Sequence, residues 1–298
     1  MALVAVSVLG AGLWRAGESD ARVRNGLIAY TKETGNCDDF ECNSVVWTVR
    51  PDGKSKRRLP CSTGGGDCRD ILPVFSSEGG RLATATVGLS DFTGGRERIK
   101  NILAVRDPRG RVLRRIPFDE VVTGLAWSPD ATQLAVNSFG LLYIVGSDGT
   151  NKKLFRKVRA LDVEWSRQGR LTWSSKHGFA IRVTDRARTR VRTLRAKARS
   201  VAWSPDGRRL AYTAPPQLIK TIGVDGRGRR TVTRRCTSIT VNLDSGIAWS
   251  PDGKQMLCTN DDNQLIAINV RTGRARVVGR GTPGLRITSF DWQRAPRR

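Results

Sequence analysis

A short motif recurs along this 298-residue chain and constrains its fold more than any other feature. In its full form the motif reads aromatic-Ser-Pro-Asp-Gly, and its copies begin 52, 38, 38, 46 and 43 residues apart. Repeats of about 40 to 50 residues that contain several short strands are typical of β-propellers. The aromatic residue of the motif occurs at six positions: Phe75, Trp127, Trp165, Trp203, Trp249 and Trp292.

The motif predicts a strand, a tight turn and a second strand. Proline fixes φ at the first central position of the turn, aspartate bonds to nearby backbone, and glycine accepts a positive φ. The segments that follow, such as 133–136 and 209–212, alternate as half-buried strands do. A second hairpin completes four strands per unit, which is one blade. We assign structural roles in these turns to Trp127, Asp130, Trp203, Asp206, Trp249 and Asp252.

The two ends of the chain complement each other. Residues 26–30 read as the second strand of a unit that has no first strand before it, and Trp292 has only six residues after it. Pairing of these two segments completes one blade and leaves no open sheet edge. We therefore predict an all-β, six-bladed β-propeller over residues 25–295, closed by pairing of the N- and C-terminal strands in one blade.

These repeats resemble those of the TolB-like family of six-bladed propellers, whose repeat is related to the WD repeat. Three of the six copies match the family pattern well, with Ala131 in place of the turn glycine in one of them. The resemblance implies the propeller fold for roughly residues 25–295. It implies no shared ligand, because the motif residues shape turns.

The chain starts with an apolar run at residues 2–14. Thirteen residues are too few to span a bilayer of about 30 Å as a helix. The run suits the apolar part of a secretory signal, with Ser19 and Ala21 as small residues before a cleavage point, although no Lys or Arg precedes it. We interpret residues 1–21 as a signal peptide or short apolar leader and expect no transmembrane span. An uncleaved anchor or a stray apolar tail is the alternative.

The six cysteines favour export, because they lie in local pairs that suit disulfides in an oxidising compartment. A zinc site built from the first four is the alternative, although their spacing is looser than in most zinc sites. We expect a periplasmic, cell-surface or secreted protein. The expected pairs are Cys37 with Cys42, Cys61 with Cys68, and Cys236 with Cys258.

Charge is the most unusual bulk property. The chain has 52 basic and 27 acidic residues, a formal net charge of +25. Many basic residues follow the second turn of a blade, as in segments 54–58 and 186–199, which predicts a basic ring on one face and the outer rim. Such a surface attracts nucleic acid, acidic polysaccharide or anionic lipid. The alternative is a merely solvated rim, since outer strands need polar side chains.

Catalytic motifs are missing from the sequence. No Gly-x-Ser-x-Gly motif occurs, and the single histidine, His177, lies in a polar turn. One histidine supplies neither a histidine-based metal centre nor a pair of imidazole acids and bases. Asp261, Asp262 and Asn263 carry oxygen ligands that suit calcium, but the same residues commonly build a turn. We therefore assign no catalytic, cofactor or metal residue and leave calcium as an alternative.

Three long connections, at 32–44, 61–73 and 86–99, indicate a working surface. In the four-strand scheme they leave the sheets on the face opposite the basic turns. Long loops on a rigid scaffold often carry binding residues. We select Asp91, Phe92 and Arg96 as candidate binding residues.

These observations predict a monomeric, exported, non-enzymatic propeller scaffold that binds a protein partner or an anionic cell-envelope polymer. One alternative is a carbohydrate-active lyase or hydrolase acting on acidic polysaccharide. Another is binding of nucleic acid or another polyanion through the basic rim, although no interleaved aromatic residues support base stacking.

Overall fold

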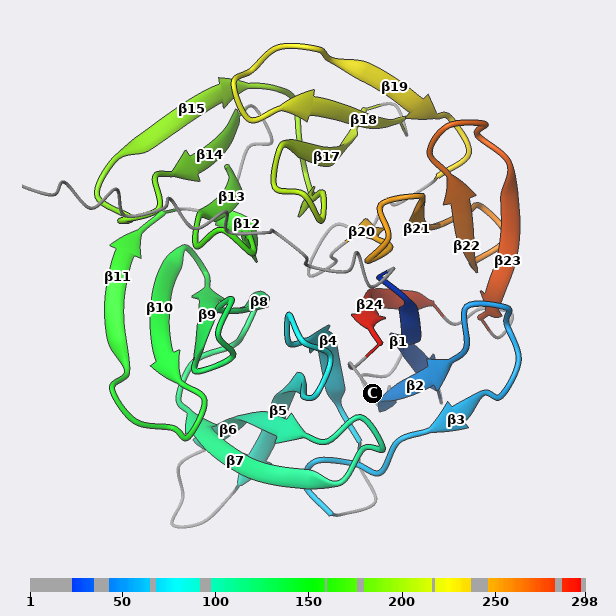
Figure 1. Ribbon diagram of the computed structural model, residues 1–298. Coiled ribbons are helices and arrows are strands. Elements are labelled where there is room, and N and C mark those ends of the chain that lie inside the picture. Colours follow the sequence, from blue (N-terminus) through cyan, green and yellow to red (C-terminus); the bar gives the residue numbers. More distant parts are fainter. Residues whose placement is uncertain are drawn as a thin grey trace, which may run out of the picture.

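The computed structural model describes residues 23–34, 43–64, 68–91, 98–158, 160–175, 180–215, 218–236, 246–281 and 286–295. Every regular element in these ranges is a strand, and the strands form six four-stranded antiparallel sheets. Figure 1 shows the sheets as blades around a central axis, which confirms the predicted six-bladed β-propeller.

The first three blades follow the chain, apart from the inner strand of blade 1. Blade 1 contains β24 (Ile287–Arg294), β1 (Asn25–Thr34), β2 (Asn43–Val49) and β3 (Arg57–Arg58). Blade 2 contains β4 (Asp70–Phe75), β5 (Leu82–Asp91), β6 (Arg98–Arg106) and β7 (Val112–Phe118). Blade 3 contains β8 (Gly124–Trp127), β9 (Gln133–Ser138), β10 (Leu141–Gly146) and β11 (Lys153–Lys157).

The other three blades repeat the same order from the axis outward. Blade 4 contains β12 (Ala160–Trp165), β13 (Leu171–Ser175), β14 (Ala180–Thr184) and β15 (Val191–Arg195). Blade 5 contains β16 (Val201–Trp203), β17 (Arg209–Ala214), β18 (Leu218–Gly223) and β19 (Arg230–Thr233). Blade 6 contains β20 (Ala248–Trp249), β21 (Gln255–Thr259), β22 (Gln264–Asn269) and β23 (Ala275–Arg280).

The motif turns form as their chemistry requires. In the turn after Trp127, the Ala131 amide donates to the Ser128 carbonyl over 3.0 Å, and the Asp130 carboxylate accepts the Ser128 hydroxyl over 2.6 Å. Ala131, which replaces the expected glycine, still adopts a φ of 56°. A positive φ costs a residue with a Cβ more than it costs glycine. The turn bonds and the packing around them therefore hold Ala131 in this conformation.

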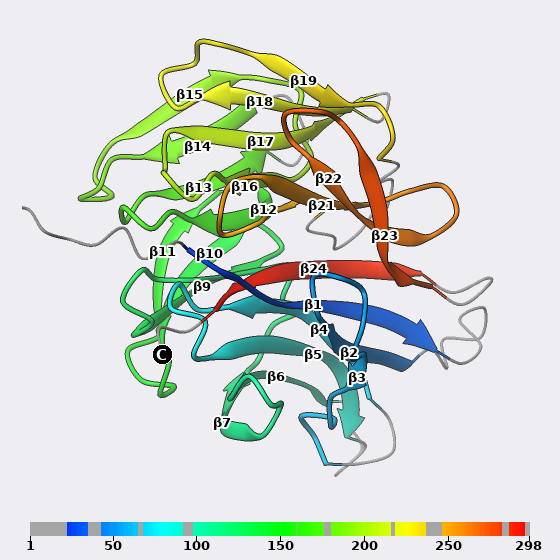
Figure 2. The same ribbon diagram turned by 45° about the vertical axis from the view of Figure 1, so that its right-hand side comes forward.

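Blade 1 closes the ring, as predicted. β24 lies antiparallel to β1, with Tyr30 opposite Phe290 and Ile28 opposite Trp292, and Figure 2 shows the two strands side by side. The Gln293 side chain accepts the Leu27 amide over 2.8 Å and donates to the Gly79 carbonyl of blade 2 over 2.7 Å. The last strand therefore completes blade 1 and joins it to blade 2.

The apolar core lies between adjacent blades. At the boundary between blades 2 and 3, for example, Leu103 and Phe118 pack in one buried cluster with Trp127 and Leu134. Aliphatic and aromatic side chains on both faces of each sheet are therefore buried. Sheets that are covered on both faces in this way support one another around the ring.

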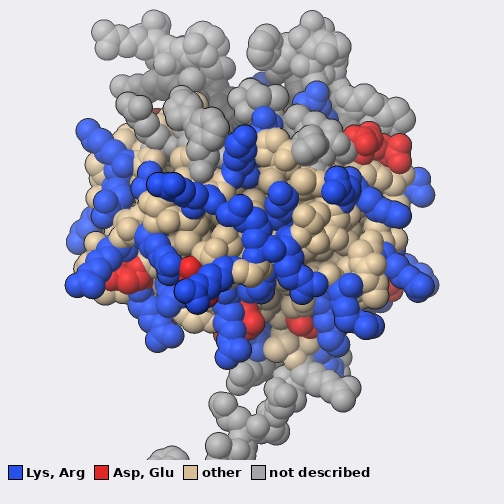
Figure 3. Space-filling view, turned by 90° about the horizontal axis from the view of Figure 1, so that it is seen from above, with Lys and Arg blue, Asp and Glu red and all other residues tan. Residues whose placement is uncertain are grey.

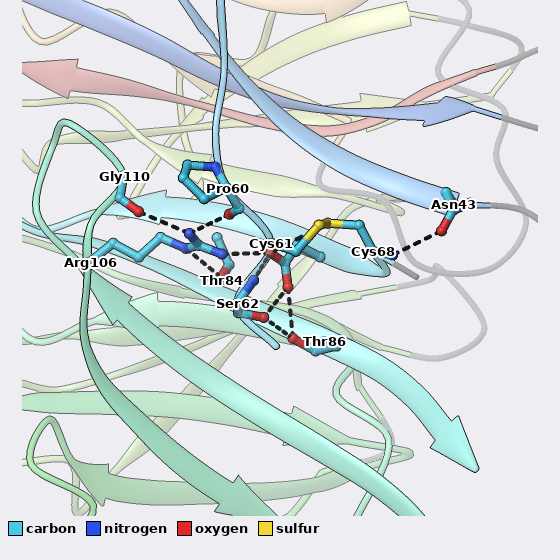
Figure 4. The surroundings of a disulfide bond; sticks show 10 residues. Asn43, Pro60, Cys61, Ser62, Cys68, Thr84, Thr86, Arg106 and Gly110 are labelled. Carbon is cyan, nitrogen blue, oxygen red and sulfur yellow. Dashed lines mark hydrogen bonds and ion pairs between the residues drawn. A yellow bond between two sulfur atoms is a disulfide. The ribbon is translucent and has the colours of Figure 1, made fainter. Parts of the chain in front are cut away.

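A disulfide and a buried ion pair secure the connection between blades 1 and 2 (Figure 4). Cys61 and Cys68 are joined by a disulfide. The guanidinium of Arg106, which is 0% exposed, contacts the Asp70 carboxylate and donates to the Pro60 carbonyl over 2.7 Å. A buried charge is tolerated only when it is paired and hydrogen-bonded, and here both conditions hold.

The second disulfide joins Cys236, beyond β19, to Cys258 in β21. Two of the three expected cysteine pairs are therefore present, and Cys37 and Cys42 lie outside the described residues. Because Cys61 and Cys68 are bonded to each other, they are not thiolate ligands, and the alternative four-cysteine zinc site does not form.

We predict that Trp292→Ala lowers the free energy of unfolding by about 3–5 kcal/mol. Trp292 is 4% exposed and packs in the cluster that closes blade 1, so its truncation leaves a cavity there. Urea unfolding followed by far-ultraviolet circular dichroism measures the change. The control is Leu113→Ala, at a side chain that is 47% exposed, and we expect a change within about 0.5 kcal/mol. Equal stability of the two variants would show that the packing of Trp292 does not stabilise the closed ring.

Candidate functional site

The inner strands of all six blades surround a central cavity of about 170 Å³. This volume is below the roughly 300–1,000 Å³ of most small-molecule sites. The motif aromatics, Phe75, Trp127, Trp165, Trp203, Trp249 and Trp292, all line the cavity.

Three carboxylates that we did not select from the sequence also line this cavity: Asp162 and Glu164 on β12, and Asp291 on β24. Glu164 and Asp291 directly precede motif tryptophans. In the three strong copies of the motif this position is alanine. The sequence signal for Glu164 and Asp291 was therefore an acidic residue at the inner-strand position where the strong copies of the motif have alanine.

Two of these carboxylates connect neighbouring blades. Asp291 accepts the amide of Phe75 in blade 2 over 2.7 Å, and Asp162 accepts the amide of Val201 in blade 5 over 3.2 Å. The Glu164 carboxylate, by contrast, forms no hydrogen bond or ion pair within the described part of the chain. Asp162 and Asp291 are therefore explained by the architecture.

Burial changes the acidity of all three groups. It raises the pKa of Asp291 to about 6, although the Phe75 and Trp292 amides that it accepts partly oppose the rise. Burial also raises the pKa values of Asp162 and Glu164, and repulsion from Asp162 and Asp291 raises that of Glu164 further. The charged forms are disfavoured because the carboxylates lie among protein atoms and close to one another.

Several residues selected from the sequence have other roles or cannot be placed. Asp261, Asp262 and Asn263 form the turn between β21 and β22, in which the Asn263 amide donates to the Asn260 carbonyl over 3.0 Å. The Asn263 side-chain oxygen accepts the Ile287 amide over 3.0 Å, so this oxygen is already engaged. Asp91 ends β5, opposite Arg98. His177, Phe92 and Arg96 lie outside the described residues.

The outer edge of the propeller is strongly basic. Figure 3 looks onto the outer edge of blades 4 and 5, where Lys and Arg side chains greatly outnumber Asp and Glu. In the described part of the chain only three ion pairs form: Asp70–Arg106, Asp107–Arg111 and Glu78–Arg167. Most of the basic charge is therefore not neutralised. Exposed basic residues on the outermost strands include Arg57, Arg58, Arg114, Arg115, Lys153, Arg156, Lys157, Arg192, Arg195, Arg230, Arg276 and Arg280.

Comparison with known proteins supports the fold and nothing finer. No family model matches the chain, and no curated protein matches it. A chain in the crystal structure of a nidogen/laminin complex aligns with a TM-score of 0.67 and 9% sequence identity, over 91% of this chain and 100% of that chain. No helix among the described residues has the length and apolar character needed to cross a membrane.

We predict that Asp291→Asn alters the pH dependence of stability. The pKa of Asp291 is raised in the folded state, from 3.8 to about 6, so the folded state binds the proton more tightly. The contribution of Asp291 to wild-type stability therefore falls as pH rises from 4 to 6, and the variant lacks this loss. We expect the variant to gain about 1–3 kcal/mol relative to wild type between pH 4 and pH 7.

Chemical unfolding at a series of pH values measures this gain. The control is Asp261→Asn, which removes one negative charge from an exposed turn. A constant difference between Asp291→Asn and wild type across this range would contradict the prediction.

Proposed function

We propose that the protein is an exported, non-enzymatic propeller scaffold that binds an anionic cell-envelope polymer through its basic outer edge. The observation that carries the proposal is the row of exposed, mostly unpaired Arg and Lys side chains on the outermost strands. Binding of many anionic groups by such a surface gains free energy from the release of counterions. The rigid ring presents this charge at low entropic cost.

Export is supported by the two disulfides and by the apolar run at residues 2–14, which we interpret as part of a leader. Structural disulfides persist in oxidising compartments and are rare in the cytosol. A protein outside the cytosol meets the acidic polymers of the envelope.

A binding role is favoured over catalysis by the central cavity. Its volume is about 170 Å³, and two of its three carboxylates, Asp162 and Asp291, accept backbone amides of a neighbouring blade. An enzyme acting on acidic polysaccharide would need a larger cleft with groups placed for proton transfer.

A protein partner is the second candidate. The nidogen/laminin structure contains a propeller of the same shape in a protein complex. A partner with an acidic surface would meet the same exposed arginines, and electrostatic complementarity would raise its association rate.

We predict that the protein binds immobilised heparin and polygalacturonate but not neutral dextran. Raising the salt concentration from 50 to 200 mM should weaken the binding by about tenfold or more, because several ionic contacts form at once. Surface plasmon resonance at both salt concentrations measures the change. If the protein binds neither heparin nor polygalacturonate at 50 mM salt, the proposed function is refuted.

A further inference from the structure

A basic hollow lies at the boundary between blades 4 and 5, on the face that carries the motif turns. It has a volume of about 690 Å³. The hollow lies between the turns of the two blades, and seven charged residues line it: Arg170, Arg186, Arg208, Arg209, Arg227, Asp206 and Asp225.

The equivalent hollow between blades 2 and 3 has the opposite charge. It measures about 460 Å³, and its charged lining residues are Glu78, Asp130, Asp148 and a single arginine, Arg81. In the aligned motifs Asp206 corresponds to Asp130, and Arg208 corresponds to Thr132. Because the same fold builds both hollows, the arginines at the boundary of blades 4 and 5 are not required by the architecture.

The two acidic groups of the basic hollow are engaged by their own turns. Asp206 accepts the Arg208 amide over 3.0 Å, and Asp225 accepts the Arg227 amide over 2.9 Å. The guanidinium groups of Arg170, Arg186, Arg208 and Arg227 form no hydrogen bond or ion pair with any described residue. These four groups can therefore donate hydrogen bonds to a ligand.

Arg209 differs from these four because its side chain is held in place. Its Nη2 donates to the Thr221 hydroxyl over 3.0 Å and to the Gly228 carbonyl. It contributes a fixed positive charge to the lining of the hollow.

A second basic hollow, of about 410 Å³, opens at the same boundary. Two arginine side chains form hydrogen bonds from one blade to the other at this boundary. Arg192 of blade 4 donates to the Asp225 carbonyl over 2.7 Å, and Arg229 of blade 5 donates to the Arg195 carbonyl over 2.7 Å. The charged residues that line the second hollow are all basic: Arg195, Lys197, Lys220 and Arg229.

We propose that this boundary is the principal binding site of the protein and that its ligand is a linear acidic polysaccharide. The inference rests on the proposed function and names its site and ligand class. Arginine forks bind carboxylate and sulfate groups in pairs of hydrogen bonds. Two basic hollows at one boundary suit a chain that carries such groups at intervals.

The lining distinguishes this ligand from single-stranded nucleic acid. Its one aromatic residue is Tyr212, which is 2% exposed. Sequence-tolerant binding of nucleic acid uses exposed aromatic side chains on which the bases stack. The described surface of the boundary offers charge and no such platform.

The test compares two triple variants that remove the same charge. The first, Arg186→Gln/Arg208→Gln/Arg227→Gln, neutralises three exposed side chains of the basic hollow. The control, Arg50→Gln/Arg109→Gln/Arg271→Gln, neutralises three exposed side chains in the corresponding turns of blades 1, 2 and 6, which line neither hollow. Isothermal titration calorimetry with a heparin hexasaccharide and with a galacturonate hexamer gives Kd in each case. Unfolding midpoints check that both variants fold.

We expect the first variant to raise Kd for at least one oligosaccharide about tenfold or more, since it removes direct charged hydrogen bonds. We expect the control to raise it less than about threefold, because only long-range attraction is lost. A larger effect on the heparin hexasaccharide would identify sulfate as the preferred group, and an equal effect would identify the carboxylate.

Equal losses in the two variants would overturn the proposed site and leave the proposed function standing. Tighter binding of a single-stranded DNA of matched charge than of either oligosaccharide would overturn the ligand class. Absence of wild-type binding to every acidic polymer would overturn the proposed function itself.

Discussion

The pairing of β24 with β1 is the interaction on which the rest of the structure depends. Without it, blade 1 lacks its inner strand, and the last blade has no partner across the gap. With it, every blade has a neighbour on both faces, and no inner strand is left out of the ring. Gln293 extends the closure to blade 2 through the Gly79 carbonyl. Closure also makes the six blade boundaries geometrically comparable. A difference in charge between two boundaries is therefore not required by the fold.

The inner strands show how the blades are held together near the axis. Asp162 and Asp291 bond to amides of the next blade, and Ser289 does the same for the Leu72 amide over 3.0 Å. Burial disfavours the charged carboxylates, but the hydrogen bonds that they accept offset part of that cost. Polar groups in the centre of this propeller are thus explained first by the need to satisfy backbone amides.

The local chemistry of the motif made the fold predictable. Pro129, Asp130 and their counterparts determine a turn, and the spacing of the turns determines the number of blades. Closure of the ring was predictable because the segment at residues 26–30 lacked a first strand, and the segment around Trp292 supplied one. The carboxylates around the cavity were harder to find, since the role of Asp291 depends on an amide 216 residues away in sequence.

The basic hollow could not be predicted from the sequence either, because residues that are far apart in the chain form it. Its lining comes from four separate turns, at positions 168–170, 186, 206–209 and 223–228, and no single segment reveals it. The sequence predicted a basic ring, but the structure shows an uneven one, with acidic groups around the hollow between blades 2 and 3. The selected residues Phe92 and Arg96, the expected pair Cys37 and Cys42, and the expected leader at 1–21 lie outside the described residues and stay predictions.

The most direct test of the account is a crystal structure of the protein with a bound acidic oligosaccharide. The account predicts ordered density at the boundary between blades 4 and 5, with carboxylate or sulfate oxygens within hydrogen-bond distance of Arg186, Arg208 or Arg227. An oligosaccharide ordered in the central cavity or between blades 2 and 3, with the boundary of blades 4 and 5 empty, would contradict it.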